Sequence, residues 1–429
     1  MTATQLSTRT LNRTLLARQL LLERAQCGPE RTIEHLVGMQ AQAPQPPYLG
    51  LFSRLSAFDP EQLAALITDR RVVRIALQRN TIHLVTAEDA VLLRRVLKPV
   101  IDNGLRHNFG AQLQGVDFAA LGARGRELVE QEPLTFARLG ELLAEEFPQA
   151  KPNALAQGVR QLVPLVQVPP RGLWGRSGAP AHTSLEAWLA GSSQDFTPSG
   201  SAPDGSAPDG LAPHGSAPDD ELDAVVLRYL AAFGPASVRD IQAWCGLTRL
   251  NAVVKRLGDR LRRYADPNGT VLYDAAESPL TDADEPAPIR LLPEYDNILL
   301  SHADRSRILD PAHRSAVFTE NGRIMSTVLI DGFVAATWRF DERTGRAGSK
   351  GGPDGAGGGS RPGVLTVVPL RTLSTREQHA MEREVGPEAA RMLELLAPGG
   401  DAREAEVRIL SKSSGSSVGV NPFPPHGRE

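Results

Sequence analysis

The chain has 429 residues, enough for two to four modules with hydrophobic cores of their own. Its net charge of −3 is no whole-chain signature of nucleic-acid binding, and Cys27 and Cys245 are too few and too far apart for a disulfide scaffold or a zinc site. Residues 1–10 lack the apolar core of a signal peptide, and no apolar run approaches the roughly 20 residues of a membrane helix, so we expect a soluble cytoplasmic protein with no membrane partner.

The basic residues are concentrated in the first half of the chain. Residues 1–110 contain 14 Arg or Lys against 9 Asp or Glu, and residues 151–180 contain four basic residues and no acidic one. A nucleic-acid partner therefore fits this half better than the whole-chain charge suggests.

Residues 1–110 predict several helices followed by a β-hairpin. Apolar residues at helical spacing predict an opening helix over about 11–22, with Thr8 or Thr10 as its cap, and Thr32 begins the next helix. The sequence Asp59-Pro60-Glu61 is a strong helix start for residues 62–69. Two β-rich runs, 72–77 and 81–86, then form a hairpin. Helices followed by such a hairpin make a winged helix, although a solvated edge hairpin protected by charge fits the same pattern.

Two further units share one design. Thr135 predicts a helix cap with Phe136, Leu139 and Leu142 turned inward, Pro152 opens another helix to about residue 162, and residues 163–175 supply a hairpin. The pattern returns 102 residues later, where Ser237 takes the place of Thr135 as the cap. Val238, Ile241 and Trp244 then occupy the inward positions, Gly246 ends the helix, Thr248 caps the next one, and residues 262–264 pair with 270–273 across an Asp-Pro-Asn-Gly turn.

The expected organisation is thus an α+β chain. It consists of a first winged-helix unit at 1–110, a second at 111–191, a disordered Gly/Ser/Ala/Pro/Asp linker at 192–220 and a third unit at 221–275. A C-terminal β-rich region at 276–398 follows, with a hairpin over Asp331-Gly332, a strand at 364–369, a flexible Gly-rich insertion at 341–363 and a closing helix at 376–396. Residues 399–429 form a loose tail.

Two glutamines separated by a single residue are the most informative candidate site. Residues two apart on a continuous helix point about 200° away from each other, so Gln40 and Gln42 could not share a ligand there. Pro44 disfavours helical geometry at Ala43, which predicts that the helix unwinds at Gln42 and that both amides converge.

At this point the sequence resembles the AlkZ-type bacterial DNA glycosylases, a family of winged helix DNA-binding domain-containing proteins. The likeness rests on the triplet Gln40-Ala41-Gln42 and on segments 11–24, 70–86, 232–247 and 291–309, in one order. The resemblance implies three tandem winged helices in a C-shaped arrangement, with a concave basic surface for duplex DNA. It also implies that both glutamines and a β-hairpin take part in excising alkylated bases, including interstrand cross-links.

The chemistry of two uncharged amides suits one kind of lesion. Guanine alkylated at N7 carries a positive charge and leaves without protonation, so an enzyme has only to hold a water near the anomeric carbon and place carbonyl dipoles beside the sugar. We therefore expect a monomeric DNA glycosylase for N7-alkylated purines in duplex DNA, with Gln40 and Gln42 as catalytic residues and no metal or cofactor. A structural alternative has Gln40 capping its helix and Gln42 packing on the prolines.

Basic residues near the predicted hairpins and loops are the candidates for DNA binding. They are Arg74, Arg79, Arg171, Arg176, His302, Arg305 and Arg339. The hairpin that the resemblance requires is placed on the strands flanking the Gly-rich insertion, where Arg339, Arg343, Arg346 and Arg361 are available to enter a groove.

Other interpretations stay open at this level. Residues 293–305 hold a rival site, in which His302 pairs with Asp296 for acid–base work or with Asp304 for a partial metal site; a capped, salt-bridged loop is the plainer reading. The chain as a whole also fits a non-enzymatic winged-helix DNA-binding regulator, or a winged-helix scaffold for proteins. The sequence has no Walker loop, Gly-x-Ser-x-Gly elbow or HExxH helix, which argues against nucleotide-binding, serine-type α/β-hydrolase and zinc-protease functions.

Overall fold

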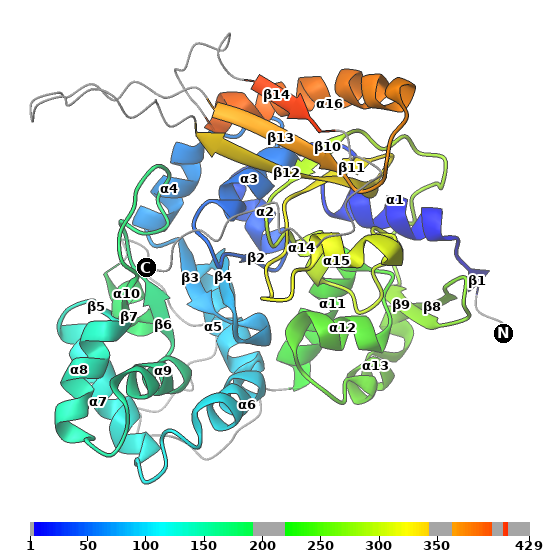
Figure 1. Cartoon of the computed structure of the whole chain (residues 1–429). Helices are drawn as coiled ribbons and strands as arrows, with labels where there is room; N and C mark the ends of the chain where they lie inside the picture. The colour runs from blue at the N-terminus through cyan, green and yellow to red at the C-terminus, as the bar shows by residue number, and fades with distance from the viewer. Residues whose placement is uncertain (1–3, 192–218, 343–362, 397–405, 411–429) are drawn as a thin grey trace, which may run out of the picture. The chain divides into compact units, whose positions relative to one another are not determined.

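The computed structural model describes residues 4–191, 219–342, 363–396 and 406–410 (Figure 1). These residues fall into two compact units. Unit 1 comprises Met1–Pro288, Leu292–Pro311 and Asp331–Phe333, and unit 2 comprises Ile289–Leu291, Ala312–Ile330 and Val334–Glu429. Helices and mixed sheets in one chain confirm the predicted α+β class. Every helix within the described ranges is too short or too polar to cross a bilayer.

The first part of unit 1 begins with helix α1 (Thr8–Arg18). Its N-cap is Ser7, whose hydroxyl accepts from the Thr10 amide, so the predicted caps lie one and three residues too late. Helix α4 (Pro60–Thr68) starts as predicted, because the Asp59 carboxylate accepts from the Glu61 amide. The other elements are β1 (Thr4–Gln5), α2 (Pro29–His35), β2 (Met39–Gln40), α3 (Pro46–Arg54), β3 (Val72–Ala76), η1 (Gln78–Asn80), β4 (Ile82–Thr86), α5 (Ala87–Val96) and α6 (Lys98–Phe109).

The predicted hairpin at 72–86 is present as β3 and β4, but it is not a free wing. It lies inside a six-stranded sheet of order β2-β4-β3-β6-β7-β5. The outer edge of β3 pairs with β6 (Leu165–Gln167), with Arg74 opposite Gln167, and β4 pairs with β2 on its other side. The alternative of a solvated edge hairpin is therefore wrong, since both edges of this hairpin pair with other strands.

The helices of the second part of unit 1 begin as predicted, but the hairpin predicted at 163–175 is wrong, because β6 pairs with β7 at residues 181–184. Thr135 caps α8 (Phe136–Glu146) through the Arg138 amide, and Pro152 opens α9 (Pro152–Leu162). Leu139 is buried in the core of this part, with Phe136 packed against the same cluster. The remaining elements are α7 (Phe118–Gln131), β5 (Leu134–Thr135), β7 (Ala181–Ser184) and α10 (Leu185–Ala190).

The third part holds three helices and a hairpin. Ser237 and Asp240 form a capping box on α12 (Val238–Cys245), and Gly246 ends that helix with a φ of +86°. The prediction that Thr248 caps the next helix was wrong: α13 (Asn251–Leu257) begins after Leu250, which supplies no side-chain cap. The other elements are α11 (Asp219–Phe233), η2 (Gly258–Arg260), β8 (Leu261–Ala265) and β9 (Val271–Ala275). Strand β1 runs parallel to β8 and completes a three-stranded sheet.

Unit 2 is built on a five-stranded sheet of order β10-β11-β12-β13-β14. The turn between β11 and β12, whose residues Asp331–Phe333 are counted in unit 1, has positive φ at Asp331 (48°) and Gly332 (80°), as predicted for a two-residue type I′ turn. The strand and closing helix predicted after the insertion are also present. The elements are β10 (Arg290–Leu292), η3 (Pro311–His313), α15 (Arg314–Val317), β11 (Thr327–Ile330), β12 (Phe333–Glu342), β13 (Gly363–Pro369), α16 (Thr375–Leu396) and β14 (Glu406–Ile409).

Three predicted segments fall on residues that the structure does not describe. Most of the expected linker, 192–218, and the Gly-rich insertion at 343–362 lie outside the described residues, as do 397–405 and 411–429 of the C-terminal segment. The last two residues of the expected linker differ from the prediction, because Asp219 and Asp220 form the first turn of α11.

Candidate functional site

The glutamine triplet lies on an extended segment, not at the end of a helix. Helix α2 ends at His35, and Gly38 (φ +95°) turns the chain into β2. A Cβ on Gly38 would lie 2.5 Å from Cγ1 of Val85, so only glycine fits this close approach. Gln40 then pairs with His83 of β4. The predicted helix break is therefore wrong: Gln40 ends a short strand, and Gln42 lies in the bend that follows it.

Strand β4 and its preceding turn hold both glutamine amides. Oε1 of Gln40 accepts from Nη2 of Arg79 at 2.7 Å, and Oε1 of Gln42 accepts from the Ile82 amide at 3.2 Å. Both partners can only donate, so their chemistry fixes which end of each carboxamide is the oxygen. Gln40 is 7% exposed, whereas Gln42 is open to solvent. Gln42 is therefore the one that a substrate can reach directly, with Gln40 packed behind it.

Arg79 anchors Gln40 from a strained turn. Its φ is +53°, and its guanidinium donates to the Trp244 carbonyl of α12 as well as to Gln40. Burial lowers the pKa of Arg79 to about 10, which leaves it charged at neutral pH. Both hydrogen bonds of the Arg79 side chain are to the protein itself, so its part in the site is to hold Gln40 and to bring a positive charge beside it.

Arg74 was predicted to contact DNA, and its burial contradicts that role. The residue is 2% exposed, and it donates to the Ala41 carbonyl at 2.9 Å and to Oε1 of Gln167 at 3.1 Å. Burial lowers its pKa to about 10, with Arg171 adding to the effect. Arg74 thus fastens the peptide carbonyl between the two glutamines, and it is buried because β6 covers the strand that carries it.

Residues 293–305, the alternative site of the sequence analysis, hold the backbone of the glutamine segment. Nδ2 of Asn297 donates to the Gly38 carbonyl at 2.7 Å, and Oδ1 of Asn297 accepts from the Gln40 amide at 3.3 Å. The Asp296 carboxylate accepts from both terminal nitrogens of Arg54, at 2.8 Å each. Arg54 is the last residue of α3, the helix that follows the glutamines. This buried loop is therefore a clamp on the glutamine segment. Sequence reasoning missed it, because the partners are 242 to 259 residues apart.

His302 does not join Asp296 in an acid–base pair. It is 1% exposed and its Nε2 lies 3.1 Å from the Phe233 carbonyl. Burial, reinforced by Arg307, lowers its pKa to about 3, so it is neutral. Its predicted contact with DNA is contradicted by this burial, and among the described residues no cluster of three His, Cys, Asp or Glu is placed to hold a metal ion. Arg305 is half-buried and donates to the Leu299 carbonyl at 2.6 Å.

The loop between β6 and β7 reaches the residues that follow the glutamines. The Tyr48 hydroxyl donates to the Gly172 carbonyl at 2.7 Å, and the Tyr48 and Trp174 rings lie 5.0 Å apart. In the same loop Arg171 donates to the Gly178 carbonyl at 3.0 Å, and Arg176 is exposed. The loop therefore places aromatic and basic side chains beside the glutamine segment. Both arginines remain predicted DNA contacts, and Trp174 is a residue that the sequence did not single out.

The last predicted DNA contact belongs to unit 2. Arg339 lies on β12 opposite Thr366 of β13, and its Nε is 2.9 Å from the Asp341 carboxylate. Its side chain is 34% exposed. Arg343, Arg346 and Arg361, which were expected beside it, lie outside the described residues, so the predicted groove-entering hairpin remains a prediction.

An α+β fold that holds two glutamine amides against a sheet fits a DNA glycosylase of the kind that the sequence resembles. A family model described as DNA glycosylase AlkZ-like matches residues 33–394, and the chain belongs to that family.

A sequence match and a structural match extend this assignment. The chain is 26% identical over 343 residues to the interstrand DNA cross-link repair glycosylase of Streptomyces sahachiroi, covering 76% of this chain and 85% of that protein. The solved structure of the Streptomyces sahachiroi DNA glycosylase AlkZ superposes with a TM-score of 0.70 at 20% identity, covering 95% of this chain and all of that one. At this identity the structural match establishes a shared fold.

Proposed function

We propose that the protein excises N7-alkylated purines from duplex DNA as a monofunctional, monomeric glycosylase, and that it unhooks interstrand cross-links built on such bases. The single observation that carries the proposal is the fixed pair of carboxamides at Gln40 and Gln42. Its relative in Streptomyces sahachiroi, named for cross-link repair, supports the second substrate.

The reaction needs no titrating side chain. The oxygen of a water forms a bond to the anomeric carbon of the sugar while the bond from that carbon to N9 breaks. The electron pair of the broken bond moves into the ring and cancels its positive charge, and the water releases its proton to solvent. The products are a neutral alkylated base and an abasic site.

We assign the water to Gln42. Its oxygen already accepts from the Ile82 amide, and a carbonyl oxygen has a second lone pair for a water hydrogen. Gln40 acts by position: its link to Arg79 keeps the segment in register, and its carboxamide dipole lies next to the place where sugar charge develops. Removing one oriented dipole from such a site costs about 10²- to 10³-fold in rate.

We also propose that residues 1–110, 111–191 and 221–275 act as three winged-helix units on DNA. The order of three helices and a hairpin, α11, α12, α13, β8 and β9, supports this assignment for the third unit. Cross-linked bases cannot leave the duplex completely, so a surface that approaches DNA from outside suits them better than a deep base-flipping pocket.

The test is an abasic-site assay. A duplex with a single N7-methylguanine is incubated with the protein and then treated with alkali, which cuts the strand wherever the base has been removed. We expect cutting with the wild type and at least tenfold less with Gln40→Ala or Gln42→Ala. Gln26→Ala removes another glutamine that is exposed, as Gln42 is, and serves as its control.

The rival functions have their own outcomes. Tight duplex binding without any cutting would point to a non-enzymatic DNA-binding regulator. Negligible binding even at low salt would leave a scaffold for protein partners.

A further inference from the structure

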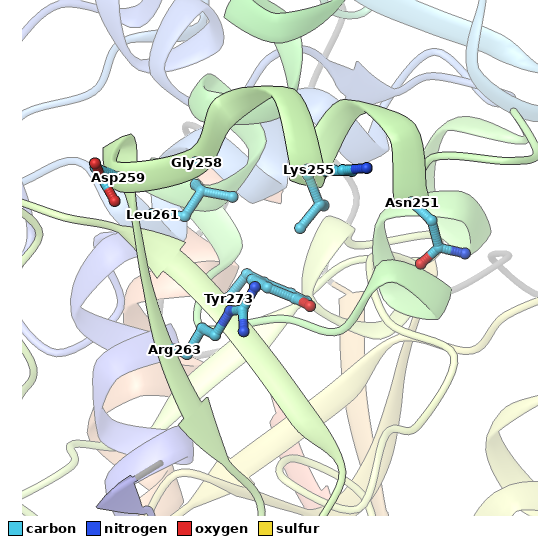
Figure 2. A pocket seen from close by; sticks show the side chains of 8 residues that line it. Asn251, Lys255, Gly258, Asp259, Leu261, Arg263 and Tyr273 are labelled. Carbon is cyan, nitrogen blue, oxygen red and sulfur yellow. The ribbon is translucent and has the colours of Figure 1, made fainter. Parts of the chain in front are cut away.

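A cleft separates α13 from the β8–β9 hairpin in the third part of unit 1. Its volume is about 400 Å³, and Val254 and Leu261 form part of its wall. Figure 2 shows Arg263 and Tyr273 side by side on the two strands, facing the helix that carries Lys255. A cleft of this size accepts a group as large as a nucleotide.

The surroundings of the cleft are positively charged. Among residues 246–275, six basic residues and one acidic residue are exposed. The exposed residues are Arg249, Lys255, Arg256, Arg260, Arg262, Arg263 and Asp259, and of these Arg256 is paired with Asp219 and Asp223 of α11. The other two acids of this stretch are engaged inside the fold: Asp274 is bound by Arg18, and Asp266 accepts from the amides of its own turn. An anion is therefore the expected occupant.

Two cations in the cleft lack a protein carboxylate. Within the described part of the chain, neither Lys255 nor Arg263 forms a salt bridge. The Arg263 guanidinium lies over the Tyr273 ring, 5.8 Å from its centre, so the ring restrains the planar group that binds phosphate oxygens in pairs. Asn251 adds an amide at one end of the cleft, and Asp259 adds an opposing charge at the other (Figure 2).

The cleft is also connected to the glutamine segment. Arg79, which holds Gln40, donates to the Trp244 carbonyl, and Gly246 packs against the Arg79 backbone. Asn251 follows Gly246 by five residues, a span of at most about 18 Å of chain. The chain from Gly246 to Asn251 therefore joins the turn that holds Gln40 to one end of the cleft.

We propose that this cleft binds backbone phosphates of duplex DNA beside the damaged base. Lys255 and Arg263 neutralise the phosphates, and Asn251 donates to a phosphate oxygen. The proposal rests on the proposed function, because it takes damaged DNA as the substrate.

Salt dependence of binding tests the proposal without relying on activity. The affinity of full-length protein for an undamaged duplex is measured by fluorescence anisotropy across a series of salt concentrations. The slope of log affinity against log salt concentration is negative, and each lost phosphate contact reduces its magnitude by about 0.9. We expect that decrease for Lys255→Ala and for Arg263→Ala. Asp259→Asn should bind more tightly than the wild type, since it removes the one acid of the cleft.

A neighbouring arginine provides the matched control. Arg262 precedes Arg263 on β8 and, by strand alternation, points to the opposite face. Arg262→Ala changes the net charge by the same amount, and we expect it to leave the slope unchanged. Equal slopes for all three alanine variants, or wild-type slopes for Lys255→Ala and Arg263→Ala, would overturn the proposal.

Modified duplexes then locate the contact. Neutral methylphosphonates, placed one at a time on either side of an N7-methylguanine, should weaken wild-type binding at one or two positions and not weaken Lys255→Ala further there. The proposal is also rejected if inorganic phosphate binds in the cleft but Lys255→Ala and Arg263→Ala bind the duplex as tightly as the wild type. If the wild type excises no base but the variants still show a reduced salt dependence of binding, the proposed function is refuted and the cleft assignment stands.

Discussion

Asn297 is expected to position Gln40 without touching the substrate. Asn297→Ala removes the donor to the Gly38 carbonyl and the acceptor for the Gln40 amide, at a residue that is 9% exposed. A buried backbone group left without a partner costs about 1 to 3 kcal/mol. The bond from the Gln40 amide is the longer of the two, at 3.3 Å, and contributes at the low end of this range. The free energy of unfolding should therefore fall by roughly 2 to 4 kcal/mol. If 2 kcal/mol of this acts on the glutamine segment during catalysis, the excision rate falls about 30-fold.

Single-turnover excision and urea unfolding measure the two parts of this effect. A positioning role predicts a lower rate at temperatures where circular dichroism shows an intact fold, with unchanged affinity for undamaged duplex. Asn297→Asp keeps the acceptor but turns an oxygen toward the Gly38 carbonyl, so it should be at least as damaging. Asn103→Ala, at an exposed helix position, is the control. A rate within twofold of wild type, despite lost stability, would refute the reasoning.

Three other predictions concern Arg79, the Arg54–Asp296 pair and the buried histidines. Arg79→Ala should reduce excision by about tenfold or more while sparing the fold, because Gln40 loses its anchor; unchanged excision would contradict this. Arg54→Met leaves the Asp296 carboxylate buried and unpaired, and should lower the free energy of unfolding in urea by about 3 to 5 kcal/mol; an effect below 1 kcal/mol would count against the clamp. Burial depresses three histidine pKa values to about 3 to 4, so the unfolded chain binds more protons and stability should fall as pH drops from about 6.5 toward 4. They are His83, His182 and His302. Urea titrations at pH 7 and pH 5 with equal unfolding free energies would disprove it.

Local signals predicted most of the secondary structure. The starts of α4, α8 and α12 follow from side-chain caps at Asp59, Thr135 and Ser237, since a cap and the amides it serves lie within four residues. The Asp331-Gly332 turn was predictable for the same reason. Thr248 failed because α13 begins without a side-chain cap.

The failures share a cause in long-range pairing. Strand β2 has two residues, too few for a β pattern, and exists because β4 pairs with it across about forty residues. Arg74 is buried on a strand whose edge pairs with β6, and beside Gly172 of the loop that follows β6, and no local feature of the sequence predicts either partner. The role of Asn297 depends on contacts across more than 250 residues. Residue types identified Gln40 and Gln42, whereas their backbone geometry required tertiary structure.

Two uncharged amides can suffice for excision only when the leaving base is already cationic. The direct measurement is single-turnover release of the free base, followed by mass spectrometry, from matched duplexes that carry either N7-methylguanine or uracil. We predict release of N7-methylguanine only, and at least 100-fold slower release by the Gln40→Ala/Gln42→Ala double variant. Equal release of uracil, or undiminished release by the double variant, would contradict the account.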